Sequence, residues 1–182
     1  MNKIRPVASK KSSLKPPDEV NIKNQIYITG QYALNIHPEN CKTTGDWHGG
    51  IWDNISVYPS EQIKTAGSIT DLNTNDIWGD YGIYDGKEEL QKIGLKIEYN
   101  PVYIADHNRA ILDMLYDYVV NVGIIFEIDN ASNEFLGYRE NIYEMLKMSK
   151  LIEKYLNEKQ LYIYNMWHDN EMKSMEEYHD FR

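Results

Sequence analysis

The sequence predicts an α+β fold, with a β-rich N-terminal half and two main helices in the C-terminal half. Before about residue 105, short segments combine apolar and polar alternation with β-branched and aromatic residues, which is typical of strands. After that point, apolar residues recur at three- and four-residue spacing over two long segments, which is typical of helices. No internal repeat is present, and the length of 182 residues suits one domain, which we expect over 23–182.

The first 22 residues are expected to form a flexible tail. They contain three prolines, two adjacent serines and few large apolar side chains, so they lack the means to build a packed core. Their lysines and arginine form the main basic concentration of the chain. The alternative is an arm that becomes ordered on a partner.

Two strands joined by a polar loop are expected next. Residues 25–36, QIYITGQYALNI, predict one strand, or two short strands that bend at Gly30. Residues 51–59, IWDNISVYP, alternate until Pro59 ends the strand. Together they predict a long β-hairpin, and the glycine-rich segment 60–88 is expected to be mostly loop.

A short helix and a further strand precede the helical half. Residues 87–94 predict a helix that ends at Gly94. Residues 95–105 predict a strand, in which Pro101 marks an edge or a break.

The clearest helix begins after Asp106, which is a good N-cap residue, and is expected to end at Gly123. The next segment, 124–128, reads as a short strand or a buried turn. A second strong helix is predicted over 138–159, where apolar residues line one stripe. The last segment, 161–182, is expected to form a further helix with a frayed acidic end.

Composition and charge exclude several classes of protein. The net charge of −9 argues against direct nucleic-acid binding, which needs clustered lysines and arginines, and it fits a basic protein partner. No apolar run approaches the ~20 residues of a membrane span, and the N-terminus has no secretory signal. A single cysteine, Cys41, excludes an internal disulfide framework. We therefore expect a cytoplasmic protein of bacterial or phage origin.

The stretch TTGDWHGGIWDN, residues 43–54, is the main candidate for a functional loop. Its structural interpretation is a glycine-bounded turn in which Asp46 caps backbone amides and Trp47 anchors the loop. Its chemical interpretation is a metal site that uses His37, Asp46 and His48, since imidazole and carboxylate groups bind zinc and similar metals. No compact H-E-x-x-H spacing supports that site, and no phosphate-binding glycine loop is present, so no cofactor is expected.

A second candidate lies at the start of the first strong helix. Asp106, His107 and Arg109 at a helix N-terminus would suit an anion. The structural interpretation, which we favour, has Asp106 as the helix cap, His107 at the margin of the core and Arg109 paired with Asp113 one turn later.

Three islands of this sequence, "ALNI", "TGDWH" and "H-x-R-A-x-L-D", occur in the same order in a group of small bacterial proteins that the chain resembles. The islands span Tyr32 to Leu115, and the "TGDWH" island is the most specific. The resemblance implies a link to toxin–antitoxin or phage-defence modules and assigns no catalytic residues. If it holds, His48 and Arg109 would belong to one shared site between sheet and helix.

Three functions remain open from the sequence, of which the third is a structural protein without enzymatic activity in a larger phage or host assembly. The first is a small protein-binding module, antitoxin-like or accessory to defence, which uses Asp46, Trp47, His48, His107 and Arg109. The second is a metal-dependent hydrolase or nuclease that uses a site of histidine and aspartate. The oligomeric state stays open.

Overall fold

The computed structural model describes residues 25–38, 52, 63–98, 100–125 and 128–177. Within these ranges, the strands are β1 (Ile26–Ile28), β2 (Thr65–Gly67), β3 (Ile83–Asp85) and β4 (Tyr103–Ala105). The helices are α1 (Gly30–Leu34), α2 (Asn75–Trp78), α3 (Lys87–Lys92), α4 (His107–Tyr116), α5 (Ala131–Phe135), α6 (Arg139–Ser149) and α7 (Glu158–Glu177). A π-helical segment, η3 (Asp117–Val122), continues α4, and a 3-10 segment, η5 (Lys150–Tyr155), continues α6. The predicted α+β class is confirmed.

The four strands form one mixed sheet in the order β2-β1-β4-β3. β1 pairs antiparallel with β2 and parallel with β4, so both of its edges are occupied. Because side chains alternate along a strand, the two faces of β1 differ. Tyr27 is buried towards α4, whereas Ile26 and Ile28 lie on the other face.

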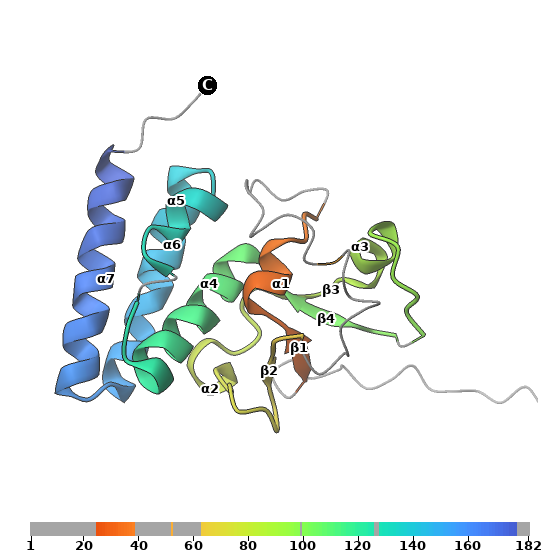
Figure 1. The fold of residues 1–182 in the computed structure, drawn as a ribbon, viewed down its shortest axis with the longest axis horizontal. Helices are drawn as coiled ribbons and strands as arrows, with labels where there is room; N and C mark the ends of the chain where they lie inside the picture. The colour runs from red at the N-terminus through yellow and green to blue at the C-terminus, as the bar shows by residue number, and fades with distance from the viewer. Residues whose placement is uncertain (1–24, 39–51, 53–62, 99, 126–127, 178–182) are drawn as a thin grey trace, which may run out of the picture.

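Helix α4 is the centre of the fold and lies between the sheet and the pair α6 and α7 (Figure 1). Its residues from Arg109 to Leu115 are all buried, because α1, α5, α6 and the sheet cover it on several sides. The predicted start after Asp106 and the predicted end at Gly123 are both confirmed. Gly123 has a φ of 80°, a backbone conformation that glycine adopts easily.

The predicted helix over 138–159 is in fact two helices. α6 and η5 end at Tyr155, and Leu156 is extended. The backbone N–H of Asn157 donates to Gln160 Oε1, and the N–H of Gln160 donates to Asn157 Oδ1, both over 3.0 Å. This reciprocal pair is a capping box that starts α7, so the final predicted helix is confirmed and begins earlier than expected.

The strand predictions need correction. Residues 30–34 form α1 rather than a strand, because Ala33 and Leu34 pack against α4. The antiparallel neighbour of β1 is β2, from the segment expected to be loop, and not 51–59. Of 51–59 the structure describes Trp52 alone, which forms a turn and donates its indole N–H to Tyr32 O over 3.1 Å.

Other expectations are met in part. The helix over 87–94 is present as α3, and the chain turns at Gly94, where φ is 93°. β4 covers only the last three residues of the predicted strand 95–105. The predicted tail, residues 1–22, lies outside the described residues. Within the described helices, none has the length and apolar character needed to cross a membrane.

Candidate functional site

The start of α4 is organised around Asp106, as the sequence predicts. Its Oδ1 accepts the backbone N–H of Arg109 over 2.8 Å, and its own N–H donates to Gly82 O over 2.6 Å. Burial raises the pKa of Asp106 to about 6. Beside it, Asn108 Nδ2 donates to Tyr81 Oη over 3.0 Å, and burial raises the pKa of Tyr81 to about 12. Asp106 is therefore a helix cap whose carboxyl is partly protected from water.

Arg109 follows one turn into the helix and is completely buried. Its Nε donates to Asp113 Oδ1 over 3.0 Å, which confirms the predicted pair. Its Nη1 donates to the carbonyl oxygens of Gly79 and Tyr81 over 3.1 and 3.0 Å. The guanidinium thus holds the loop that precedes β3 against α4.

The other guanidinium nitrogen reaches the sheet and α2. Nη2 of Arg109 lies 2.6 Å from Tyr27 Oη, 3.1 Å from Thr74 Oγ1 and 2.8 Å from Asn75 Oδ1. The guanidinium carbon lies 5.1 Å from the centre of the Tyr27 ring and 5.5 Å from that of Trp78. Cation–π attraction therefore adds to the hydrogen bonds.

The negative partner, Asp113, is equally well satisfied. Oδ1 accepts from Thr74 Oγ1 over 2.5 Å as well as from Arg109, and Oδ2 accepts from Thr29 Oγ1 over 2.7 Å. Because Thr74 gives its only hydroxyl proton to Asp113, the Tyr27 hydroxyl donates to Thr74 Oγ1 over 3.1 Å. Burial, supported by the charge of Asp113, raises the pKa of Tyr27 and keeps that proton in place.

We call this set the Arg109 network, and its members are Tyr27, Thr29, Thr74, Asn75, Arg109 and Asp113. The five N–H donors of arginine all point to protein acceptors here, so none remains for a bound anion. The geometry favours the structural interpretation of Arg109 over the anion site. The network joins β1, α2 and α4 in the interior.

His107 also lies inside the core rather than at its margin. Its Nδ1 lies 3.1 Å from Phe135 O, and its Nε2 lies 3.0 Å from Ile36 O. The exposed ring of His37 packs edge-on against the His107 ring, with 5.2 Å between ring centres. His107 thus ties the start of α4 to the chain after α1 and to the end of α5.

The other predicted site residues cannot be placed relative to Asp106, His107 and Arg109. Asp46, Trp47 and His48 lie outside the described residues, so a site shared by His48 and Arg109 stays a prediction. The proposed metal ligands His37, Asp46 and His48 are described only at His37. Among the residues that the structure places, no three His, Cys, Asp or Glu side chains are arranged to hold a metal ion.

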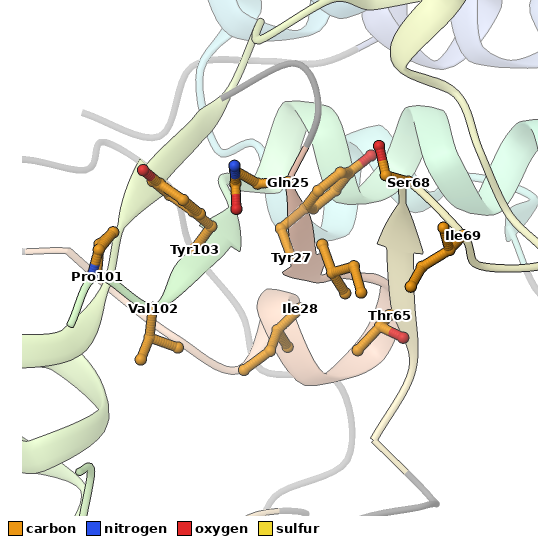
Figure 2. A pocket seen from close by; sticks show the side chains of 10 residues that line it. Gln25, Tyr27, Ile28, Thr65, Ser68, Ile69, Pro101, Val102 and Tyr103 are labelled. Carbon is orange, nitrogen blue, oxygen red and sulfur yellow. The ribbon is translucent and has the colours of Figure 1, made fainter. Parts of the chain in front are cut away.

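The sequence did not predict a pocket that is lined by residues of β1, β2 and β4 and of the turns beside them (Figure 2). Its volume is about 590 Å³, within the range of pockets that accept ligands. None of the described residues that line it is charged. We call one part of its apolar lining the outer face, formed by Ile26, Ile28, Ile69, Pro101 and Val102. Tyr27 and Tyr103, which share the opposite face of the sheet, line the pocket as well.

Ile69 is the most unusual residue of the outer face. It is 95% exposed and has a φ of 61°, in the left-handed region that β-branched residues avoid. It sits in the turn that leaves β2, where the N–H of Thr70 donates to Gly67 O over 3.2 Å. A left-handed isoleucine costs about 1–2 kcal/mol, and full exposure forgoes the stabilisation that burial of its side chain would bring. The turn therefore presents an apolar side chain to solvent at a cost to stability.

Comparison with known proteins adds no relationship: no protein-family model, curated protein or solved structure matches this chain. The site is therefore argued from its own geometry.

Proposed function

We propose that this chain is a small protein-binding module that binds its partner through the outer face. The observation that carries the proposal is Ile69, an exposed isoleucine held in a strained backbone conformation beside an apolar pocket. Strain of this kind persists where the surrounding structure imposes it, and it is concentrated at functional sites. Ile26, 44% exposed on β1, adds apolar surface to the same face.

The pocket suits side chains of a partner protein. Residues that dominate binding energy fill apolar pockets at the centre of an interface. Here Ile69 stands at the rim of a pocket lined by Ile28, Val102 and Tyr103, so the surface offers both a protruding group and a cavity. Such a pair of features favours a partner that has a matching pocket and an apolar side chain to insert.

Charge favours a basic partner. No charged residue lines the pocket in the part of the chain that the structure describes, while the whole chain carries a net charge of −9. Apolar contacts would then supply most of the affinity, and the acidic body would accelerate the approach of a basic protein. A cytoplasmic antitoxin-like or defence accessory role, which the resemblance of the sequence implies, is compatible with this surface.

The alternative function, a metal-dependent hydrolase or nuclease, depends on residues beyond those described. Metal analysis of protein purified without chelators distinguishes it. A stoichiometric metal together with hydrolytic activity would replace the binding proposal.

Co-purification from the native host tests the proposal. The tagged wild-type chain should retain one stoichiometric partner, quantified by native mass spectrometry. Ile69→Asp should reduce that retention at least tenfold, because the charge cannot enter an apolar interface without a large desolvation cost. Ile124→Asp is the matched control, since Ile124 is 55% exposed and does not line the pocket.

Both variants should keep the wild-type circular dichroism spectrum. Equal retention by Ile69→Asp and wild type, or a chain that purifies only as a free monomer, would contradict the proposal.

A further inference from the structure

A second buried polar contact, remote in sequence from the Arg109 network, joins α7 to α5. Glu171 of α7 is completely buried, and its Oε2 accepts the hydroxyl proton of Ser132 at the start of α5. Its Oε1 is buried and has no hydrogen-bond partner among the described residues. No ion pair of Glu171 occurs within the described residues, so the carboxyl differs sharply from the fully satisfied Asp113.

This environment suits the neutral acid better than the carboxylate. Removing a carboxylate from water is costly unless its charge is paired and its oxygens accept hydrogen bonds. Burial raises the pKa of Glu171 to about 7, although the hydrogen bonds from Ser132 and Asn130 act in the opposite direction. The negative charge of Asp129 raises it further.

Among the described residues, no cation offsets the charge of Glu171. Burial lowers the pKa of His168, one turn earlier on α7, and its Nε2 is buried without a partner, so this ring favours the neutral form. Asp169 on α7 and Glu134 on α5 are exposed acids. The charged residues of α6 are exposed at the surface, and they are Arg139, Glu140, Glu144 and Lys147.

Helix α5 depends on such contacts because it has only five residues, too few for a helix that is stable alone. Just before it, Trp167 Nε1 donates to Ile128 O over 3.0 Å, and Asn170 Nδ2 donates to Asp129 Oδ1 over 3.3 Å. At its other end, Phe135 O contacts His107 Nδ1. α5 therefore connects α7 to the buried start of α4.

We propose that Glu171, buried between α7 and α5, is a pH-sensitive joint that holds α5 closed on α7 when it is protonated. It loosens α5 when the carboxylate forms, because burial opposes the charge. Because the opposite end of α5 contacts His107, loosening of α5 extends to the start of α4. The proposed pH dependence of this joint does not require a partner at the outer face.

The direction of the pH effect follows from the difference in proton binding between the closed and the open state. The folded state holds the proton of Glu171 up to about pH 7, whereas an open state releases it near the ordinary value of 4.5. The closed state is thus favoured at mildly acidic pH and loses stability as the pH rises to about 7. With a pKa of about 7 in the closed state and 4.5 in the open state, the closed-to-open ratio falls about tenfold between pH 6 and pH 8.

Amide hydrogen exchange of peptides covering 128–136 tests the joint. After correction for the intrinsic exchange rate, wild-type protection should fall about tenfold from pH 6 to pH 8. Glu171→Gln, which cannot ionise, should show the same protection at both values. Glu134→Gln, on an exposed residue of the same helix, is the matched control and should behave like wild type. Wild-type protection that does not change with pH, or a pH dependence that persists in Glu171→Gln, would overturn the proposal.

If Glu171→Gln does not fold, the titration of the Glu171 side-chain carbon in wild-type protein, followed by NMR, decides the same question. A midpoint near pH 7 would support the joint. A midpoint below pH 5 would overturn it.

Discussion

The two faces of β1 carry opposite chemistry. On the inner face, Tyr27 enters the Arg109 network, where a buried cation and a buried anion have every group satisfied. On the outer face, Ile26 and Ile69 are exposed beside an apolar pocket. Neighbouring residues of one three-residue strand thus contact a buried charged network on one side and form part of an exposed apolar surface on the other.

The contrast between the two faces shows which features indicate a function and which indicate a structural role. A buried polar cluster that has no open donor holds elements together, whatever the chemical reactivity of its residue types. An exposed apolar residue in a strained turn gains little stabilisation from burial within the described part of the chain. We therefore assign structure to the inner face and binding to the outer face, and each prediction below tests one side of that assignment.

The largest effect is expected for Arg109→Met, which leaves Asp113 buried and unpaired. Loss of one partner of a buried pair costs about 3–5 kcal/mol of unfolding free energy. Chemical denaturation measures the loss. Lys64→Met removes the exposed partner of Asp117, with which Lys64 forms a 2.7 Å pair, and should cost at most about 1 kcal/mol. Similar small losses for both variants would refute the structural assignment of Arg109.

A smaller loss is expected for Gly82→Ala, which adds one carbon beside the network. Gly82 has a φ of 69°, and a Cβ there would lie 2.5 Å from Asp106 Oδ1 and 2.6 Å from Arg109 Cβ. Strain and crowding together should cost about 2–4 kcal/mol in thermal or chemical unfolding. Gly79→Ala has a similar φ of 60° with no atom within 4 Å, so it isolates the strain and should cost about 1 kcal/mol. Equal losses would show that the contact with α4 is looser than described.

On the outer face, a substitution at Ile69 should raise the unfolding free energy rather than lower it, because the left-handed backbone of Ile69 costs stability. Ile69→Asn places a residue that tolerates the left-handed region and should raise the unfolding free energy by about 1 kcal/mol. Ile26→Asn is the control, since Ile26 is an exposed isoleucine of the same face in a strand, and it should give no gain. A loss of stability in Ile69→Asn would mean that the isoleucine contributes to the fold.

The last prediction concerns the pH dependence that Asp106 gives to stability. Its folded-state pKa of about 6 lies above the ordinary 3.8, so ionisation of Asp106 lowers stability as the pH rises from about 4 to about 6 and has no further effect above that range. Asp106→Asn keeps an N-cap residue and removes this dependence. The stability difference, wild type minus variant, should therefore decrease over that interval. A difference that increases would show that the cap favours the charged form.

The helical half of the fold could be predicted well because its signals are local. Asp106, the apolar stripe of α4 and Gly123 define one helix by its cap, its period and its end. The division between α6 and α7 was missed although the Asn157 to Gln160 capping box that marks it is readable in the sequence.

The pairing of the strands could not be predicted from the sequence, although β1 and β4 lie inside two of the predicted strands, 25–36 and 95–105. Each strand has three residues, too few to show a period of two, and β1 pairs with partners at 65–67 and 103–105. The segment 30–34 has strand-like neighbours, and its helix is stabilised by packing on α4. Contacts between segments that are distant in sequence therefore determine the strand pairing and the helix α1.

The candidate site was predictable only where partners are near in sequence. The pair of Arg109 and Asp113 follows from their four-residue spacing, whereas Tyr27 and Thr74 reach the same network from distant segments. Ile69 could not be foreseen, because local preferences disfavour an isoleucine in a left-handed turn.

Partner retention by Ile69→Asn, measured on the preparation used for its unfolding free energy, tests the central assignment most directly. The account predicts a more stable protein that has lost its co-purified partner at least tenfold. Full retention of the partner by this variant would contradict it.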